Sequence, residues 1–374
     1  MASGSAAGYY SNFNKDNFKI FGDEGDFVTA PEICQIFGES IAVWLFSELT
    51  YTGYKGPWQL VELGPGSGKL MFDVINSLRR FDSLKTLSVH LVEVSDTLAK
   101  EQEKKLCGSV SEAVSDKDYY RKNTTRDGIE IYWYKLIDNV PENFSVIIAN
   151  EFLDALPVHQ FKRVDGKFRE IYLNLNKENE LVFMEGKGSS IHSEGLVPEY
   201  VKNRLDVGEY EISPEAGTFV TQIAQRITHK GGFALLIDYG HNGERKSFSL
   251  RGYKKHEEVK NLLERPGEFD ITADVNFEYL KKLVETETLV FGPITQRDFI
   301  LKLGGAVRLK MLLRTISGDV EKQNQLFDAF EMLTGEGDNM GIKFKLLSIF
   351  PATLKGILEK RENAPIAFVD KLIS

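Results

Sequence analysis

The stretch Trp58-Gln59-Leu60-Val61-Glu62-Leu63-Gly64-Pro65-Gly66-Ser67-Gly68-Lys69-Leu70 decides the fold of this chain. A short apolar run reaches an acid, passes through three alternate glycines and leads into the helical pattern of residues 71–78. This order predicts the first strand, the turn and the first helix of a nucleotide-binding α/β domain.

The spacing of the glycines separates the ligands that such a turn can hold. A phosphate-binding P-loop needs glycine at position 63 and Ser or Thr at position 70, where this chain has Leu63 and Leu70. A dinucleotide fingerprint that starts at Gly64 puts its third glycine at Lys69, whose long side chain would obstruct close packing of helix on strand. The phosphate-binding versions of the turn therefore fit poorly.

The acid before the turn favours a ligand without phosphate. The charge of Glu62 would repel a phosphate but can pair with an α-ammonium group, which S-adenosylmethionine (SAM) carries together with a sulfonium. A second acid, Glu93, ends the next apolar run about 20 residues beyond the glycines, where it could bind ribose hydroxyls. The cofactor-binding residues expected here are Glu62, Gly64, Gly66, Gly68, Glu93 and Val94.

Composition limits the kind of protein further. The chain has 374 residues, 42% of them hydrophobic, which is enough for a sizeable core. Its net charge of −9 disfavours nucleic acid as a partner, and no apolar run approaches the ~18 residues of a membrane span. The two cysteines form no pair at metal spacing, so we expect neither a metal site nor a disulfide scaffold.

A second group of polar residues follows the apolar run of residues 145–149. Asn150, Glu151 and Asp154 come directly after this run, which is typical of a buried parallel strand. The carboxyl ends of such strands face the ligand crevice, so these side chains should lie beside the cofactor. We expect Asn150 to contact the cofactor and the two acids to serve catalysis.

The pattern along the chain indicates one α/β core with insertions. Residues 159–184 look like an antiparallel meander with a hairpin turn at Asp165-Gly166, and the parallel pattern resumes at residues 233–240. Thr29 and Glu32 have the spacing of a helix capping box, and the acidic loop 22–26 before them could close over the site. The expected segments are 1–57 (N-terminal segment with a capped helix), 58–157 (SAM-binding core), 158–210 (inserted antiparallel β subdomain), 211–240 (core), 241–275 (insertion) and 276–374 (C-terminal helices and last strands).

Taken together, several of these stretches resemble the MidA-like family of bacterial and mitochondrial SAM-dependent methyltransferases. The matching stretches are residues 25–32 (GDFVTAPE), 61–68 (VELGPGSG), 150–157 (NEFLDALP), 237–240 (IDYG), 270–275 (DITADV) and 340–344 (MGIKF). The resemblance implies a Rossmann-like, seven-stranded class I methyltransferase sheet with inserted β-rich and helical segments. For mitochondrial members it also implies the matrix as location and methylation of a protein arginine, on a complex I subunit, in support of complex I assembly.

A guanidinium acceptor would require acids at the site, because its charge and its planar fork of donors suit carboxylates. Glu151 is the first candidate, with Asp154 or Glu211 as a second acid. Two other functions stay open: a small-molecule methyltransferase with an enclosed pocket, and a non-catalytic assembly factor that binds SAM. A nicotinamide-dependent oxidoreductase is a more distant alternative. The sequence leaves the oligomeric state open, and a homodimer is compatible with it.

Overall fold

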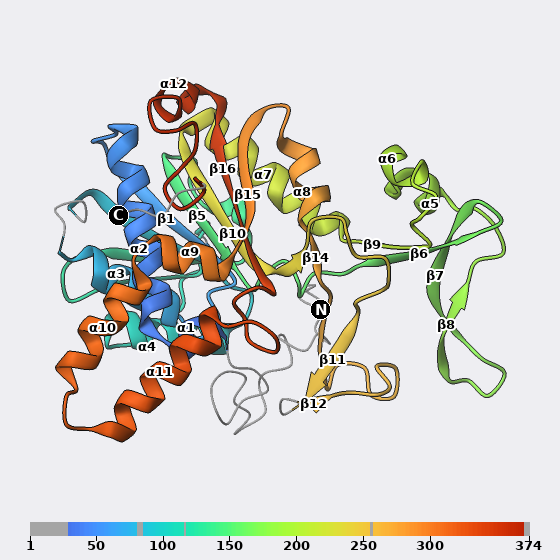
Figure 1. The fold of residues 1–374 in the computed structure, drawn as a ribbon, viewed down its shortest axis with the longest axis horizontal. Helices are drawn as coiled ribbons and strands as arrows, with labels where there is room; N and C mark the ends of the chain where they lie inside the picture. Colours follow the sequence, from blue (N-terminus) through green and yellow to red (C-terminus); the bar gives the residue numbers. More distant parts are fainter. Residues whose placement is uncertain (1–28, 81–84, 116, 255–256, 370–374) are drawn as a thin grey trace.

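A nine-stranded mixed sheet forms the centre of the computed structural model, which describes residues 29–80, 85–115, 117–254 and 257–369 (Figure 1). Its strands are β1 (Trp58–Leu63), β2 (Leu87–Val92), β3 (Arg121–Thr124), β4 (Glu130–Tyr134), β5 (Ser145–Asn150), β10 (Gly232–His241), β14 (Val275–Asn276), β15 (Thr288–Thr295) and β16 (Phe344–Pro351). The strand order is β15-β16-β10-β5-β1-β2-β4-β3, and β14 pairs with β10.

Seven of these strands, from β4 through β2, β1, β5, β10 and β16 to β15, make the sheet that the sequence predicts. The first five are parallel to one another, and β16 is antiparallel to β10. Every residue of β1 and β5 is buried, which explains why both read as continuous apolar runs. The predicted class I methyltransferase fold is confirmed, with β3 added at one edge and β14 at the end of β10.

Helices cover both faces of the sheet, and successive strand residues point into two separate cores. Leu60 of β1 belongs to the core on one face, whereas Val61 and Leu63 belong to the core on the other. The first core is covered by α2 (Gln35–Thr52), α3 (Lys69–Leu78), α4 (Asp96–Cys107), α9 (Gln296–Lys302), α10 (Gly305–Thr315) and α11 (Val320–Thr334). The second is covered by α7 (Pro214–Lys230) and α8 (Phe277–Val284).

The N-terminal helix differs from the predicted one. Cys34 has an extended backbone (φ −155°, ψ 131°) and separates the short α1 (Ala30–Ile33) from α2. The Thr29 side chain makes no capping hydrogen bond, and the Glu32 carboxylate accepts one from the Ser67 hydroxyl in the glycine turn instead. The predicted capping box was therefore wrong, because Glu32 joins α1 to the turn. The acidic loop 22–26 lies outside the described residues.

A second sheet stands apart from the first and contains the residues of the expected meander together with a fourth strand, β9 (Figure 1). Its strands β6 (His159–Val164), β7 (Lys167–Leu175), β8 (Leu181–Glu185) and β9 (Glu209–Ile212) are antiparallel in the order β8-β7-β6-β9. Asp165 and Gly166 both have positive φ (51° and 78°), as a two-residue hairpin turn between β6 and β7 requires. The helices α5 (Ile191–Leu196) and α6 (Glu199–Lys202) complete this part.

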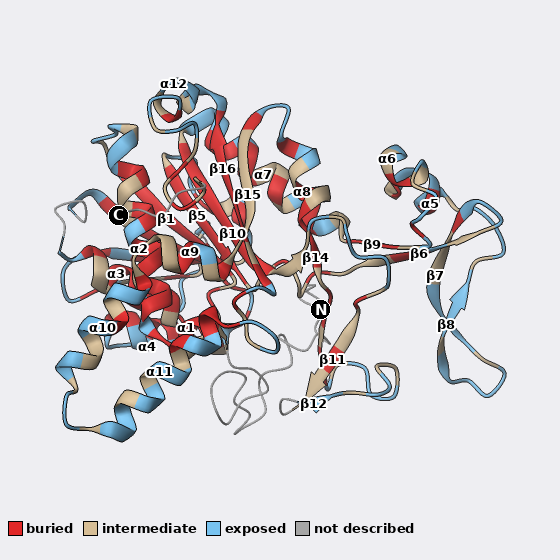
Figure 2. Ribbon diagram, in the orientation of Figure 1, coloured by how far each residue is buried: buried red, intermediate tan, exposed pale blue. Residues whose placement is uncertain are grey.

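Three further strands form a small third sheet in the order β12-β11-β13. They are β11 (Arg251–Lys254), β12 (Glu257–Glu258) and β13 (Asp270–Thr272), and the last described helix is α12 (Lys355–Leu358). Figure 2 shows that burial concentrates in the central sheet, whereas β7 and β8 are largely exposed. In the described part of the chain, every helix is too short or too polar to cross a membrane.

Candidate active site

A cavity of about 940 Å³ lies at the carboxyl ends of the adjacent parallel strands β2, β1, β5 and β10. Ligands of open α/β sheets bind at this edge, and the volume suits a molecule of cofactor size. Seven acidic residues line the cavity against two lysines. The acids are Glu62, Glu93, Asp138, Glu151, Asp154, Glu215 and Asp270, and the lysines are Lys69 and Lys135. The cavity is therefore suited to a cationic ligand.

The three glycines of the turn all have a left-handed backbone, with φ of 61°, 52° and 75° at Gly64, Gly66 and Gly68. Gly64 and Gly66, two of the expected cofactor-binding residues, line the cavity. Gly68 is not among the lining residues, because it precedes α3 and packs against α4, where an added Cβ would lie 3.2 Å from Gln102 Cγ. Its position supports packing of the helix rather than direct contact with the cofactor.

Glu62, the last residue but one of β1, is buried beside the turn and lines the cavity. Its Oε2 atom has no hydrogen-bond partner among the described residues. Burial, and then the nearby charge of Glu93, raise the pKa of Glu62 to about 8. A buried acid without a partner fits the ammonium group of SAM, since a positive charge there would satisfy the oxygen and restore the carboxylate.

Glu93 follows β2 and is held in place by its neighbours. Its Oε1 accepts a hydrogen bond from the Ser95 backbone N–H at 2.8 Å, and its Oε2 accepts one from Gln102 Nε2 at 3.0 Å. Burial raises the pKa of Glu93 to about 7 against these hydrogen bonds. Val94, the other residue predicted here, is partly exposed and also lines the cavity. Both positions agree with a role in holding the ribose side of SAM.

Gln102 of α4 connects the two halves of the expected cofactor site. Its Nε2 donates to the Gly66 carbonyl oxygen at 2.7 Å as well as to Glu93, and its Oε1 accepts from Trp133 Nε1 at 2.9 Å. The side chain is fully buried. The sequence offered no sign of this residue, because a polar residue in a helix usually faces solvent.

Replacing Gln102 by Leu is expected to lower the free energy of unfolding by about 2–4 kcal/mol, because it leaves the buried Trp133 N–H and the Gly66 carbonyl without partners. Affinity for SAM should fall by about tenfold as Glu93 loses its support. Chemical denaturation and calorimetric titration measure the two effects. Glu101→Leu, on the exposed side of the same helix, is the control. Equal effects of the two substitutions would contradict the role of Gln102.

The titration of Glu62 predicts a pH dependence of SAM affinity. The carboxyl group is protonated in the free protein below a pKa of about 8, and an ammonium ligand favours the ionised form. Affinity should therefore rise with pH between about 6 and 7.5, by at most about tenfold per pH unit from this group. Calorimetric titration over this range measures the slope, and Glu62→Gln should flatten it. An unchanged slope in that variant would contradict the pairing.

On the other side of the cavity, Glu151 follows β5 with a left-handed backbone (φ 49°), which is uncommon for a residue other than glycine. Its Oε1 accepts hydrogen bonds from the Ala30 backbone N–H at 3.1 Å and from Asn150 Nδ2 at 3.4 Å. Burial, and then the charge of Asp154, raise the pKa of Glu151 to about 8. Glu151 and Asn150 both line the cavity, so strand β5 delivers both predicted side chains to it.

Asp154 lies next to Glu151 and is part of a hydrogen-bonded group. Its Oδ2 accepts from the Tyr239 hydroxyl and, at 2.8 Å, from the Thr272 hydroxyl, whereas Oδ1 is buried without a partner among the described residues. Burial raises the pKa of Asp154, and the two hydroxyl donors oppose this effect. Asp238 of β10 is fully buried behind it and accepts from the backbone N–H groups of Leu153 (3.0 Å) and Asp154 (3.2 Å).

Glu211, the third predicted catalytic acid, does not line the cavity. It lies in β9 of the second sheet, where its carboxylate accepts hydrogen bonds from Gln160 Nε2 at 2.8 Å and from the Ser249 backbone and hydroxyl. The expectation that it joins Glu151 is corrected here, because these donors fix it as a link between the second sheet and the segment before β11. Asp238 is the third acid near Glu151 instead.

Tyr239, which lines the cavity, and the buried Asp238 before it were missed in the sequence, although a signal was present. They follow the apolar run of residues 233–237, just as Asn150 and Glu151 follow the apolar run of residues 145–149. The rule that strand ends face the ligand crevice applies to both strands, which are parallel neighbours in the sheet.

The fold and the cavity together define the class of the protein. It is a class I SAM-binding protein, in which one acid lies beside a glycine turn and a second acid follows the neighbouring strand. A family model of S-adenosyl-L-methionine-dependent methyltransferases matches residues 40–294. The chain belongs to this family, and SAM is its cofactor. The resemblance to MidA-like methyltransferases and the predicted cofactor are confirmed.

Similar proteins agree with this assignment. "Protein arginine methyltransferase NDUFAF7 homolog, mitochondrial" of Caenorhabditis elegans is 50% identical over 369 residues, which cover 99% of this chain and 85% of that protein. "Protein arginine methyltransferase NDUFAF7, mitochondrial" of Danio rerio is 40% identical over 88% of this chain and 78% of its own length. A crystal structure from Burkholderia thailandensis with bound S-adenosyl-homocysteine has the same fold, with a TM-score of 0.76 at 23% identity over 99% of this chain and 88% of that one.

Proposed function

We propose that this methyltransferase transfers the methyl group of SAM to a guanidinium nitrogen of an arginine in a partner protein. The observation that supports this acceptor most directly is the pair of acids Glu151 and Asp154 at one end of the cavity, with the fully buried Asp238 behind them. All three have raised pKa values because burial disfavours their charged forms. A guanidinium is permanently charged and carries five donors in a plane, so it would restore the carboxylates and bind to them.

The order of the strands supports the assignment of the two ends of the cavity. Glu93 follows β2, the glycine turn follows β1, and Glu151 follows β5, so the cofactor residues and the acid group occupy successive positions along one sheet edge. Neighbouring strands lie about 4.8 Å apart. The acids of β5 and β10 are therefore on the far side of the glycine turn from Glu93, where a methyl acceptor would enter.

In the transfer step, SAM supplies a methyl group activated by a sulfonium. The arginine nitrogen would gain a bond to this methyl group as the methyl–sulfur bond breaks, and it would then lose one proton. Glu151 would hold the guanidinium by its charge, orient the nitrogen and accept this proton at a carboxylate oxygen. Ala30 N–H and Asn150 Nδ2 bind its Oε1, so no reorganisation of this side chain is needed.

The partner and the location belong to the same proposal. The relatives from C. elegans and D. rerio are named as mitochondrial protein arginine methyltransferases. Together with the resemblance to mitochondrial members of the MidA-like family, these names support a complex I subunit as the substrate and the mitochondrial matrix as the place of action.

The distribution of transferred methyl groups tests this function. The protein is incubated with methyl-labelled SAM and a mitochondrial extract, and the label is then measured in the protein and small-molecule fractions. We expect label in a protein of the extract. Label in small molecules alone would favour a small-molecule methyltransferase, and SAM binding without any transfer would favour a non-catalytic assembly factor.

A further inference from the structure

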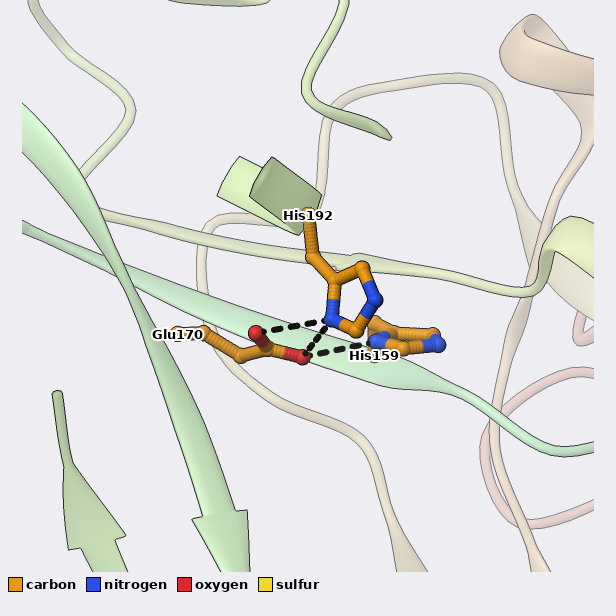
Figure 3. A group of neighbouring side chains, drawn as sticks. All are labelled: His159, Glu170 and His192. Atoms are coloured by element: carbon orange, nitrogen blue, oxygen red, sulfur yellow. Dashed lines mark hydrogen bonds and ion pairs between the residues drawn. The ribbon is translucent and has the colours of Figure 1, made fainter. Parts of the chain in front are cut away.

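Three side chains that metals commonly bind meet on the second sheet, away from the cavity. His159 is the first residue of β6, Glu170 lies in β7 and His192 lies in the first turn of α5 (Figure 3). None of the three lines the SAM cavity. The chemistry of the methyl-transfer site therefore gives no reason for this arrangement.

The fold brings these residues together from three separate elements. Glu170 pairs with Phe161 in the antiparallel β6–β7 ladder, so His159, two residues before Phe161, points to the same face. A capping box between Ser190 and Ser193 starts α5 and places His192 over that face. Figure 3 shows both imidazole rings turned toward the carboxylate.

The contacts converge on the carboxylate of Glu170. Its Oε1 lies 2.8 Å from His159 Nδ1 and 3.0 Å from His192 Nδ1, and one ligand atom from each residue lies within 4.8 Å of the other two. The other oxygen, Oε2, also lies 3.0 Å from His192 Nδ1, and it accepts a hydrogen bond from the Ser190 hydroxyl at 3.1 Å. Such a contact orients a metal-ligating carboxylate and leaves its second oxygen directed at the ion.

We propose that His159, Glu170 and His192 form a binding site for a divalent transition-metal ion of the zinc type. Two imidazoles and one carboxylate are a ligand set that zinc uses, with bonds of about 2.0–2.2 Å. Ligand atoms of such a tetrahedron lie roughly 3.3 Å apart. The two Nδ1 atoms, which lie 2.8 Å and 3.0 Å from Glu170 Oε1, therefore need to move away from this oxygen by only a few tenths of an ångström. A fourth position stays open for water or for a group of a bound partner.

The ion would fasten α5 to the second sheet. In the metal-free cluster, both Nδ1 atoms must carry protons to donate to the one carboxylate. On metal binding, the ring proton of each neutral imidazole would move to Nε2, which leaves Nδ1 free to bind the ion. Local sequence spacing could not indicate this site, because His159 lies 11 residues from Glu170 along the chain and His192 lies 22 residues from it. The three residues meet only through the register of β6 and β7 and the placement of α5.

Metal titration of the whole chain tests the proposal. The protein is stripped with a chelator, and Zn²⁺ is titrated against a competing fluorescent indicator. We expect one saturable site per chain, and an affinity lower by about 100-fold or more in His192→Ala, because loss of a ligand exceeds the effect of a supporting contact. His229→Ala, an exposed histidine at the end of α7, should bind like the wild type.

A second variant and a second ion test whether misfolding, rather than loss of a ligand, lowers the metal affinity. His159→Gln should lose the site as well, while circular dichroism and SAM affinity of both variants stay at the wild-type values. Co²⁺ bound to the wild type should give the visible bands of a tetrahedral site. A protein without a saturable site, or a site that both variants retain, would overturn the proposal and leave the cluster a set of hydrogen bonds.

Discussion

Replacing Glu151 by Gln is expected to lower the rate of methyl transfer by about 10²–10³-fold while SAM affinity stays within about twofold. The amide keeps the size of the side chain and can still accept the hydrogen bond from the Ala30 N–H. It loses the negative charge that would hold a guanidinium and the oxygen that would accept its proton. Single-turnover transfer from labelled SAM and calorimetric titration of SAM measure the two quantities.

The control for this substitution is Glu321→Gln, in an exposed turn of α11, which removes the same charge far from the cavity. Its transfer rate should equal that of the wild type. Full activity of Glu151→Gln would remove Glu151 from the mechanism, and a parallel loss of SAM binding would place it in the cofactor site instead.

The second large effect is expected at Gly64, the first glycine of the turn. Gly64→Ala places a Cβ on a left-handed backbone (φ 61°), and this atom would lie 2.8 Å from Phe152 Cδ2, which is closer than real Cβ contacts. Because both residues line the cavity, the change disturbs its floor. We expect SAM affinity to fall by about 100-fold, which corresponds to roughly 2.7 kcal/mol.

Gly128→Ala is the matched control for this change. Gly128 also has a left-handed backbone (φ 86°), but an added Cβ there meets nothing within 4 Å among the described residues. Both variants carry the backbone cost of about 1–2 kcal/mol, and only Gly64→Ala should lose SAM affinity in a calorimetric titration. Equal SAM affinities in the two variants would show that the turn does not form the floor of the site.

The central sheet could be predicted from the sequence because its strands carry strong local signals. The buried strands β1 and β5 read as apolar runs, and each ends at polar residues that the structure places in one cavity. The glycine spacing and Glu62 indicated the cofactor because charge and backbone freedom act within a few residues of one another. These features depend on local physical chemistry.

What the sequence did not reveal depends on contacts between distant segments. Gln102 reaches Gly66 and Trp133, 36 and 31 residues away, and a helical position gives no sign of such contacts. Glu211 satisfied the rule of an acid beside a strand, yet its strand belongs to the second sheet and its carboxylate is occupied by other donors. Tertiary contacts, which local sequence does not encode, decided both cases.

The most direct test of the proposed activity is the identity of the methylated residue. The wild-type protein and Glu151→Gln are each incubated with labelled SAM and recombinant complex I subunits, and tandem mass spectrometry locates the label. The acid group at the end of β5 and β10 predicts label on an arginine in the wild-type reaction and its loss in the variant. Label on lysine or on another residue type, or equal labelling by both proteins, would contradict the account.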